Sequence, residues 1–370
     1  MLKLKKLLFG FVIAFSCVIF VNIQEVCAAE CYVPVEVQNL VNYRYNEMVD
    51  LIKNKNIDFD VTLQSLQNTE LGSPFLVLDE NTSSQDEIYY FPIINGRGEV
   101  VLVMSVMGTD EGWRLAMDTE YVEVLESVDY TEKEEVILHK YDKGYMVEND
   151  IKRYWVSQKD KQIHVNRVGN SVYNQSQDYV KKQLKRLKKA RTDLTTDDKN
   201  ECCGAYSPSF STSTSTAKIM KLHNKQSQGN YGLCWAATVA TIVNYIYGKD
   251  YTAMEIADLN NVGYDEGGSL ALMKNALSKC LVTYWYMKSG QLDFDTIKLN
   301  VKEKRPIAVR AEAEGKAPHA VTLYGYGGDF IYLWNSGNSK SQLIEYSEKG
   351  TVFPYANATY LWVDSLYGYE

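Results

Sequence analysis

The 370-residue chain has few histidines, no excess of positive charge and too few cysteines to be built around disulfides. It contains four histidines and seven cysteines, and 39 lysines and arginines stand against 47 aspartates and glutamates, for a formal net charge of −8. No basic field marks it as a nucleic-acid-binding protein. No Cys or His spacing is that of a zinc site. We therefore expect no nucleic-acid partner and no metal site.

Long apolar runs are also missing, except at the N-terminus. The run Leu7 to Val21 follows Lys3, Lys5 and Lys6, and Cys27-Ala28-Ala29 offers small residues for cleavage. This order is typical of an export signal, and the run is short for a membrane span. We expect residues 1–29 to be removed and the mature chain to be secreted, with no stable membrane insertion.

Charge and periodicity divide the mature chain into two parts. Residues 30–204 have a net charge of −10, whereas residues 205–370 have none. The first part opens with apolar residues at helical spacing, from Val37 to about Lys55, and then changes to a period of two. It has eight β-prone runs: Ser73–Leu78, Ile88–Ile94, Glu99–Met107, Trp113–Met117, Val122–Val128, Glu135–His139, Ile151–Val156 and Gln162–Val168. We predict a β-rich domain over residues 30–185.

A linker separates the two parts. The helix-like stretch Gln175–Arg191 ends in a cluster of lysines and arginines, and the following 25 residues are rich in Ser, Thr, Asp and Gly. Such composition cannot bury enough apolar surface to order itself, and exposed linkers are preferred sites of proteolysis. We predict a linker over residues 186–217 and a cleavage between Arg186 and Ala217.

The candidate nucleophile is Cys234, which lies in the stretch Gln228-Gly229-Asn230-Tyr231-Gly232-Leu233-Cys234-Trp235-Ala236. An apolar, alanine-rich segment follows the cysteine, and Gly248 supplies a stop, so we predict a helix that begins at Cys234. A thiolate at the first turn of a helix faces unpaired backbone N–H groups and the positive end of the macrodipole. We expect this position to contribute to activation of the thiol.

His319 is the candidate base, because it precedes the β-prone run Ala320–Tyr326 at the end of a loop. A second run, Phe330–Asn335, follows the turn Gly327-Gly328-Asp329. Two antiparallel strands joined by this turn would bring His319 and Asn335 side by side. The amide of Asn335 could then hold the imidazole in one tautomer and one direction.

Taken together, Gln-Gly-x-x-Gly-x-Cys-Trp-Ala, His-Ala-Val and Trp-Asn-Ser-Gly resemble the motifs of the papain-like cysteine peptidase superfamily. The resemblance covers about residues 218–370, and the short Cys-to-His interval and large upstream part are most similar to the secreted staphopain and streptopain type. It implies a nucleophile (Cys234), a base (His319), an orienting amide (Asn335) and an oxyanion-hole side chain (Gln228). The reaction that this resemblance implies requires no cofactor.

The resemblance also implies the architecture. Helices come first and strands follow after residue 234, which favours an α+β papain-like domain over residues 218–370, with the active cleft between its helical and antiparallel β halves. The upstream β-rich domain would then be a propeptide that covers the cleft as an intramolecular inhibitor, or else a binding module that stays attached. Gly267, Gly268 and Trp235 are assigned to substrate binding.

One departure from the family pattern concerns the tryptophan that commonly stands two places after the asparagine and shields it. This place holds Gly337, and Trp334 or Trp362 are the candidates to replace the missing ring. Five cysteines follow residue 29, an odd number that is consistent with one free thiol, and the pairing of Cys31, Cys202, Cys203 and Cys280 is left open.

Three functions fit these residues. The first is a secreted cysteine endopeptidase, made as a zymogen, that acts on protein or peptide substrates. The second is an acyl transferase or amidase with a specific target, for example with transglutaminase-like or toxin activity, because the same Cys-His pair serves such reactions. The third is an inactive binding module that retains the fold.

Overall fold

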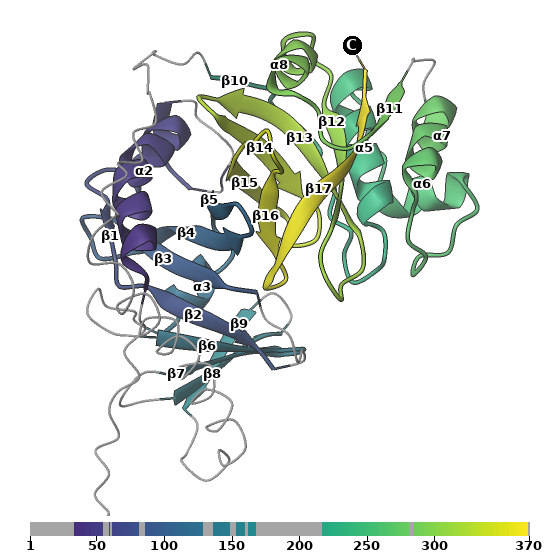
Figure 1. The fold of residues 1–370 in the computed structure, drawn as a ribbon. Coiled ribbons are helices and arrows are strands. Elements are labelled where there is room, and N and C mark those ends of the chain that lie inside the picture. Colours follow the sequence, from purple (N-terminus) through teal and green to yellow (C-terminus); the bar gives the residue numbers. More distant parts are fainter. Residues whose placement is uncertain are drawn as a thin grey trace, which may run out of the picture.

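A computed structural model gives the fold of the protein (Figure 1). It describes residues 33–54, 59, 61–80, 86–128, 136–148, 153–159, 162–167, 217–280 and 285–368. The predicted signal peptide, the helix-like stretch 175–191 and the linker up to residue 216 lie outside the described residues, as do Cys31, Cys202 and Cys203. Within these ranges, every helix is too short or too polar to cross a membrane.

The upstream region, residues 33–167, is a set of strands with one long helix against it. Helix α2 (Val35–Asn54) buries Val37, Val41 and Met48 along one face, at the spacing that predicted it. The strands are β1 (Glu70–Leu71), β2 (Phe75–Asp79), β3 (Ile88–Ile94), β4 (Val100–Thr109), β5 (Gly112–Asp118), β6 (Val136–Tyr141), β7 (Gly144–Glu148), β8 (Arg153–Lys159) and β9 (Gln162–Arg167). The short helix α3 (Val122–Glu126) follows β5.

The downstream region, residues 217–368, has its helices before most of its strands. The helices are α5 (Cys234–Tyr247), α6 (Ala253–Leu259), α7 (Leu270–Cys280) and α8 (Phe294–Lys302). The strands are β10 (Lys218–Ile219), β11 (Tyr286–Ser289), β12 (Ile307–Glu312), β13 (His319–Gly327), β14 (Phe330–Asn335), β15 (Lys340–Glu345), β16 (Val352–Tyr355) and β17 (Ala358–Tyr367). Helix α6 begins with a capping box in which Thr252 and Glu255 bond each other's backbone.

All of these strands belong to one hydrogen-bonded network. From the far end of the upstream region, neighbouring strands follow the order β9, β8, β7, β6, β2, β3, β4, β5, and then β15, β14, β13, β12 and β17. The β2–β6 pairing is parallel, and the others in this series are antiparallel. Strand β5 joins β15 through the pairs Leu343–Met117 and Ile344–Ala116. The upstream sheet therefore continues directly into the downstream one.

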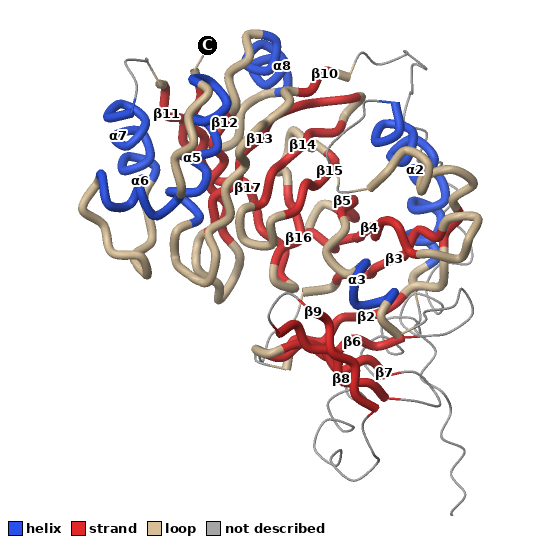
Figure 2. Tube along the Cα trace, turned by 180° about the vertical axis from the view of Figure 1, so that it is seen from behind, coloured by secondary structure: helices blue, strands red, loops and turns tan. Residues whose placement is uncertain are grey.

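Helices lie at the two ends of this assembly. Helix α2 packs beside β3 and β4, whereas α5, α6 and α7 gather at the opposite end, as Figures 1 and 2 show. One hydrophobic core extends from α2 through both regions, with Met104 upstream and Phe330 downstream among its members. A second core fixes α5, α6 and α7 against β12, β13 and β17 around Trp235.

The structure confirms the mixed α+β class with a large antiparallel sheet. One predicted strand is wrong, because residues 122–126 form helix α3, whose Val124 and Leu125 turn inward. Strands β1, β7, β10 and β16 were not predicted. Strand β16 matters most for function, since it carries Tyr355.

Candidate active site

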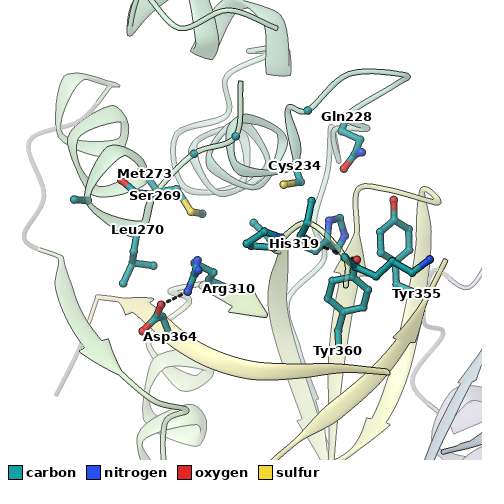
Figure 3. Close-up of a pocket in the computed structure, with 18 of the residues that line it drawn as sticks. Gln228, Cys234, Ser269, Leu270, Met273, Arg310, His319, Tyr355, Tyr360 and Asp364 are labelled. Carbon is teal, nitrogen blue, oxygen red and sulfur yellow. Dashed lines mark hydrogen bonds and ion pairs between the residues drawn. The ribbon is translucent and has the colours of Figure 1, made fainter. Parts of the chain in front are cut away.

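Cys234 is the first residue of α5, as the sequence predicted. Leu233 precedes the helix and provides no side-chain cap, and Gly248 ends it in the left-handed conformation, with φ of 59°. The thiol is half-buried and lines a cavity of about 1070 Å³ that also contains Gln228 and His319. Figure 3 shows the three side chains gathered at one side of this cavity. A substrate in the cavity would meet all three.

The surroundings of the thiol act on its pKa in both directions. Burial raises the pKa of Cys234, while backbone N–H groups of Ala320, Trp235 and Cys234 itself lower it. Burial has the larger effect, so the pKa of Cys234 is raised overall. The N–H groups at the helix start lower the pKa as expected, but by less than burial raises it. The Ala320 contact also shows that the thiol lies against the start of β13, one residue from His319.

His319 and Asn335 form the contact predicted from the hairpin. They lie at the adjoining ends of β13 and β14, which pair in antiparallel register up to Thr322 and Trp334. His319 Nε2 lies 2.7 Å from Asn335 Oδ1, and both side chains are buried. The hairpin turn itself therefore brings His319 and Asn335 together.

The hydrogen bonds of Asn335 determine which nitrogen of His319 carries the proton. Asn335 Nδ2 donates to Gln342 Oε1 at 3.3 Å, and Asn335 Oδ1 accepts from the Gly337 N–H at 3.0 Å. An amide oxygen only accepts, so His319 Nε2 must be the donor in its bond to Asn335. The other ring nitrogen, Nδ1, is then unprotonated and available to take a proton from a thiol.

The ring that covers the imidazole is Tyr355 of β16. Its centroid lies 4.2 Å from that of His319, with an angle of 18° between the two planes, and Tyr360 of β17 approaches edge-on. A Cβ added at Gly337 would overlap the phenol of Tyr355. Gly337 therefore leaves room for a ring supplied by another strand.

Neither candidate tryptophan takes this role. The indole of Trp334 donates to the Gln226 carbonyl, and that of Trp362 donates to the Asp364 carbonyl. Burial under Tyr355 and its neighbours lowers the pKa of His319 to about 4, although the Asn335 contact acts in the opposite direction. At neutral pH the imidazole is uncharged.

Gln228 lies beside the thiol with its amide partly engaged. Its backbone N–H donates to the Ser336 carbonyl, and its Nε2 donates to the Tyr231 carbonyl at 3.2 Å. The Nε2 group has a second N–H, and Oε1 is buried without a hydrogen-bond partner among the described residues. Gln228 and Cys234 line the same cavity, and the hydrogen bond of Nε2 to Tyr231 holds the side chain in place there.

The other three predicted binding residues divide into two kinds. Gly267 and Gly268 line the cavity, whereas Trp235 is fully buried below them and does not belong to its lining. The indole N–H of Trp235 donates to the Glu266 carbonyl at 3.2 Å, and a Cβ at Gly268 would overlap the indole ring. The ring of Trp235 thus supports the glycine loop from below and is not exposed to the cavity.

Sequence reasoning missed the far end of the cavity. Arg310 and Asp364 lie there, 2.6 Å apart, and Leu270 and Met273 line the same part of the cavity (Figure 3). These residues come from β12, β17 and α7, and no local motif links them. All lining residues in the described part of the chain fall between Gln228 and Asp364. The described upstream residues do not cover this cavity.

Comparisons with known proteins give only distant likenesses. No protein-family model and no curated protein matches the chain. The peptidase domain of Streptococcus ComA, a bi-functional ABC transporter involved in a quorum sensing pathway, aligns with a TM-score of 0.30 and 16% identity, over 40% of this chain and 100% of that domain. A putative C39-like peptidase from Bacillus anthracis aligns with a TM-score of 0.27 and 13% identity, over 35% of this chain and 98% of that one.

Proposed function

We propose that the protein is a secreted cysteine endopeptidase made as a zymogen, with a papain-like catalytic domain over residues 218–370. The observation that carries the proposal is the arrangement of Cys234 at a helix start, beside a His319 whose Nε2–H is held by Asn335. Cys234 and His319 line one cavity, which is large enough for a peptide segment, and the buried Asn335 holds His319 by a hydrogen bond. The motifs favour the staphopain and streptopain type within this superfamily.

The reaction follows from the tautomer. Nδ1 of His319 takes the Cys234 proton, and the sulfur attacks a peptide carbonyl carbon, so that the oxyanion is stabilised by Gln228 Nε2–H and the Cys234 backbone N–H. The amide C–N bond then breaks, and the imidazolium returns its proton to the departing amine. Water, deprotonated by the same imidazole, hydrolyses the thioester and restores the thiol.

The resting pair is neutral in this proposal. The pKa of His319 is lowered to about 4 and that of Cys234 is raised, so thiol and imidazole are both uncharged before attack. Proton transfer therefore accompanies attack on the substrate, and His319 acts as a general base. An acidic medium would protonate the imidazole and remove the base.

The upstream region is assigned as the propeptide, residues 30–185, with activation in the linker 186–217. Its described residues pair with β15 through β5 and do not line the cavity, so inhibition by covering the cleft is not assigned to them. Export by the N-terminal signal is a further part of this proposal, as is intramolecular inhibition before cleavage, which is assigned to upstream residues outside the described ranges.

The test is incubation of the chain 30–370 under reducing conditions, beside Cys234→Ala, with intact mass and casein hydrolysis as measurements. We expect the wild type to be cut between Arg186 and Ala217 and to gain activity, and the variant to do neither. A wild type that stays intact and inert, even after trypsin cuts the linker, would exclude general proteolysis. A narrow-target acyl transferase or amidase, or a binding module, would then be the better hypothesis.

A further inference from the structure

The hydrogen bonds of the site continue beyond Asn335 into the upstream region. Asn335 Nδ2 donates to Gln342 Oε1, and Gln342 Nε2 donates to Asp118 Oδ2 at 2.9 Å and to the Pro354 carbonyl at 3.0 Å. Gln342 belongs to β15, whereas Asp118 ends β5. All four side chains from His319 to Asp118 are buried.

We propose that Gln342 is a positioning residue of the active site, and that Asp118 of the upstream region completes it. This inference rests on the proposed function, in which Asn335 orients His319, because it assigns Gln342 as the residue that orients Asn335. The upstream region would then support the catalytic geometry from behind the cleft.

The direction of each hydrogen bond carries the argument. A carbonyl oxygen and a carboxylate oxygen only accept, so the partners of Gln342 Nε2 fix which end of this amide is nitrogen. Its oxygen must then face Asn335, which turns the Asn335 nitrogen toward Gln342 and the Asn335 oxygen toward His319. The imidazole is left with one tautomer, protonated on Nε2. Without Gln342, Asn335 loses the partner that holds its nitrogen away from His319.

Asp118 adds a buried carboxyl to this amide. Burial raises the pKa of Asp118 to about 7, the charge of Glu120 adds to the rise, and the hydrogen bonds from Gln342 and the Glu120 backbone oppose it. The carboxyl retains an acceptor oxygen whether or not it is protonated. It comes with the strand pairing of β5 and β15, so its contact exists only while the two regions are docked.

The contact at Pro354 links the same amide to the cover of the site. Pro354 immediately precedes Tyr355, whose ring stacks on His319. Gln342 therefore holds both the amide below the imidazole and the strand whose ring lies over it. This position explains why an uncharged, fully buried glutamine occurs in the middle of β15.

The first experiment replaces Gln342 with methionine, which keeps the length of the side chain but removes its hydrogen bonds. In a Cys234→Ala background, which prevents self-cleavage, ¹⁵N chemical shifts of the His319 ring report its tautomer. We expect the Nε2–H form alone with Gln342 and a mixture of both tautomers in Gln342→Met. With Cys234 present, we expect kcat to fall roughly ten-fold to a hundred-fold with KM unchanged, because a misplaced base costs rate rather than binding.

The second experiment tests the upstream partner with Asp118→Asn and Asp118→Ala. Ser347→Ala is the matched control, because it removes another hydrogen bond between the two regions, from Arg114 Nη2 to Ser347 Oγ at 3.2 Å. That bond does not belong to the series of hydrogen bonds from His319 to Asp118. We expect Asp118→Ala to shift the tautomer in the same direction as Gln342→Met and to lower the rate of Cys234 alkylation by iodoacetamide. Asp118→Asn keeps an acceptor oxygen for Gln342 Nε2 and should retain the wild-type tautomer and alkylation rate. We expect Ser347→Ala to match the wild type in both.

A single tautomer in Gln342→Met, with the wild-type alkylation rate, would overturn the positioning role. An Asp118→Ala variant that behaves as Ser347→Ala would overturn the upstream contribution. The ring shifts and the alkylation rate need no peptide substrate. A protein with no hydrolytic activity would therefore refute the proposed function and still decide this inference.

Discussion

At the scale of single residues, the site depends on a tyrosine that belongs to none of the three sequence motifs. Tyr355 occupies the space that Gly337 leaves open and covers one face of His319. It keeps water from the imidazole, and burial lowers the pKa of this ring to about 4. The pKa of Tyr355 itself is raised by burial, so its phenol stays neutral over the working range.

Replacing Tyr355 with alanine should raise the pKa of His319 from about 4 toward 6.5, because the ring gains access to water. Tyr355→Phe is the control, since it keeps the aromatic face. An NMR titration of the His319 ring in the Cys234→Ala protein measures the change. A midpoint that stays near 4 in Tyr355→Ala would show that the stacked ring does not cause the shift.

The lowered pKa of His319 also determines how the free energy of unfolding changes with pH. The unfolded imidazole takes up a proton below about pH 6.5, whereas the folded one does so only near pH 4, so the unfolded state binds more protons in this window. The contribution of His319 to the free energy of unfolding is therefore retained above pH 6.5 and lost as the pH falls to 4. The loss is on the order of 3 kcal/mol, and Tyr355→Ala should show less of it.

At the scale of elements, the start of α5 is fixed by the loop that passes over it. Trp235 is the second residue of the helix, and its indole lies under Gly268 and bonds the Glu266 carbonyl. Any movement of this ring displaces the neighbouring Cys234. The two glycines therefore differ. A Cβ at Gly268 would overlap the indole of Trp235, whereas a Cβ at Gly267 would meet nothing within 4 Å.

Gly268→Ala should therefore destabilise the protein and lower its activity, because the added methyl group overlaps the indole of Trp235. Overpacking of this kind costs about 1–3 kcal/mol. Gly267→Ala is the matched control and should keep the wild-type stability. Urea unfolding and the rate of Cys234 alkylation measure both effects. Equal losses in the two variants would contradict the assigned role of Trp235.

The elements also show what the sequence could and could not predict. The helix at Cys234 and the contact of His319 with Asn335 depend on local patterns and one short turn, so they were predictable. Tyr355 and Gln342 reach the site from β16 and β15, and their placement depends on strand pairing that no motif marks. The segment 122–126 has a β-prone composition, but it forms a short helix, and this helix buries Val124 and Leu125 against β4.

At the scale of the whole molecule, the two regions dock through strand pairing and through a buried cation. Arg44 of α2 lies 2.6 Å from Asp329 and 3.9 Å from Glu345, and its guanidinium stacks over Phe330 at 4.4 Å. Only 3% of its side chain is exposed. Its partners are less enclosed, since 41% of the Asp329 side chain is exposed and Glu345 also accepts from the Leu115 N–H, so water and that bond offset part of the loss when Arg44 is removed.

Arg44→Met should therefore weaken docking by about 1–2 kcal/mol, because the partner carboxylates keep contact with water. After one cut in the linker, we expect the two pieces of the wild type to co-elute in size-exclusion chromatography and those of Arg44→Met to separate. Arg97→Met is the control, because Arg97 pairs with Glu99 at the surface of the upstream region. Co-elution of the Arg44→Met pieces at every salt concentration would show that the strand pairing holds the regions by itself.

The pairing of β5 with β15 also has a consequence for the order of folding. Ribosomes make β5 long before β15, and contacts between segments so far apart in the chain form late. Until β15 arrives, the backbone N–H and C=O groups along that side of β5 have no strand partner, and such an open edge invites other chains to add to it. Permanent loss of the upstream region would open the same edge on β15. A mature enzyme that sheds its upstream region would therefore need a second copy or another strand to close it, or would be prone to aggregate.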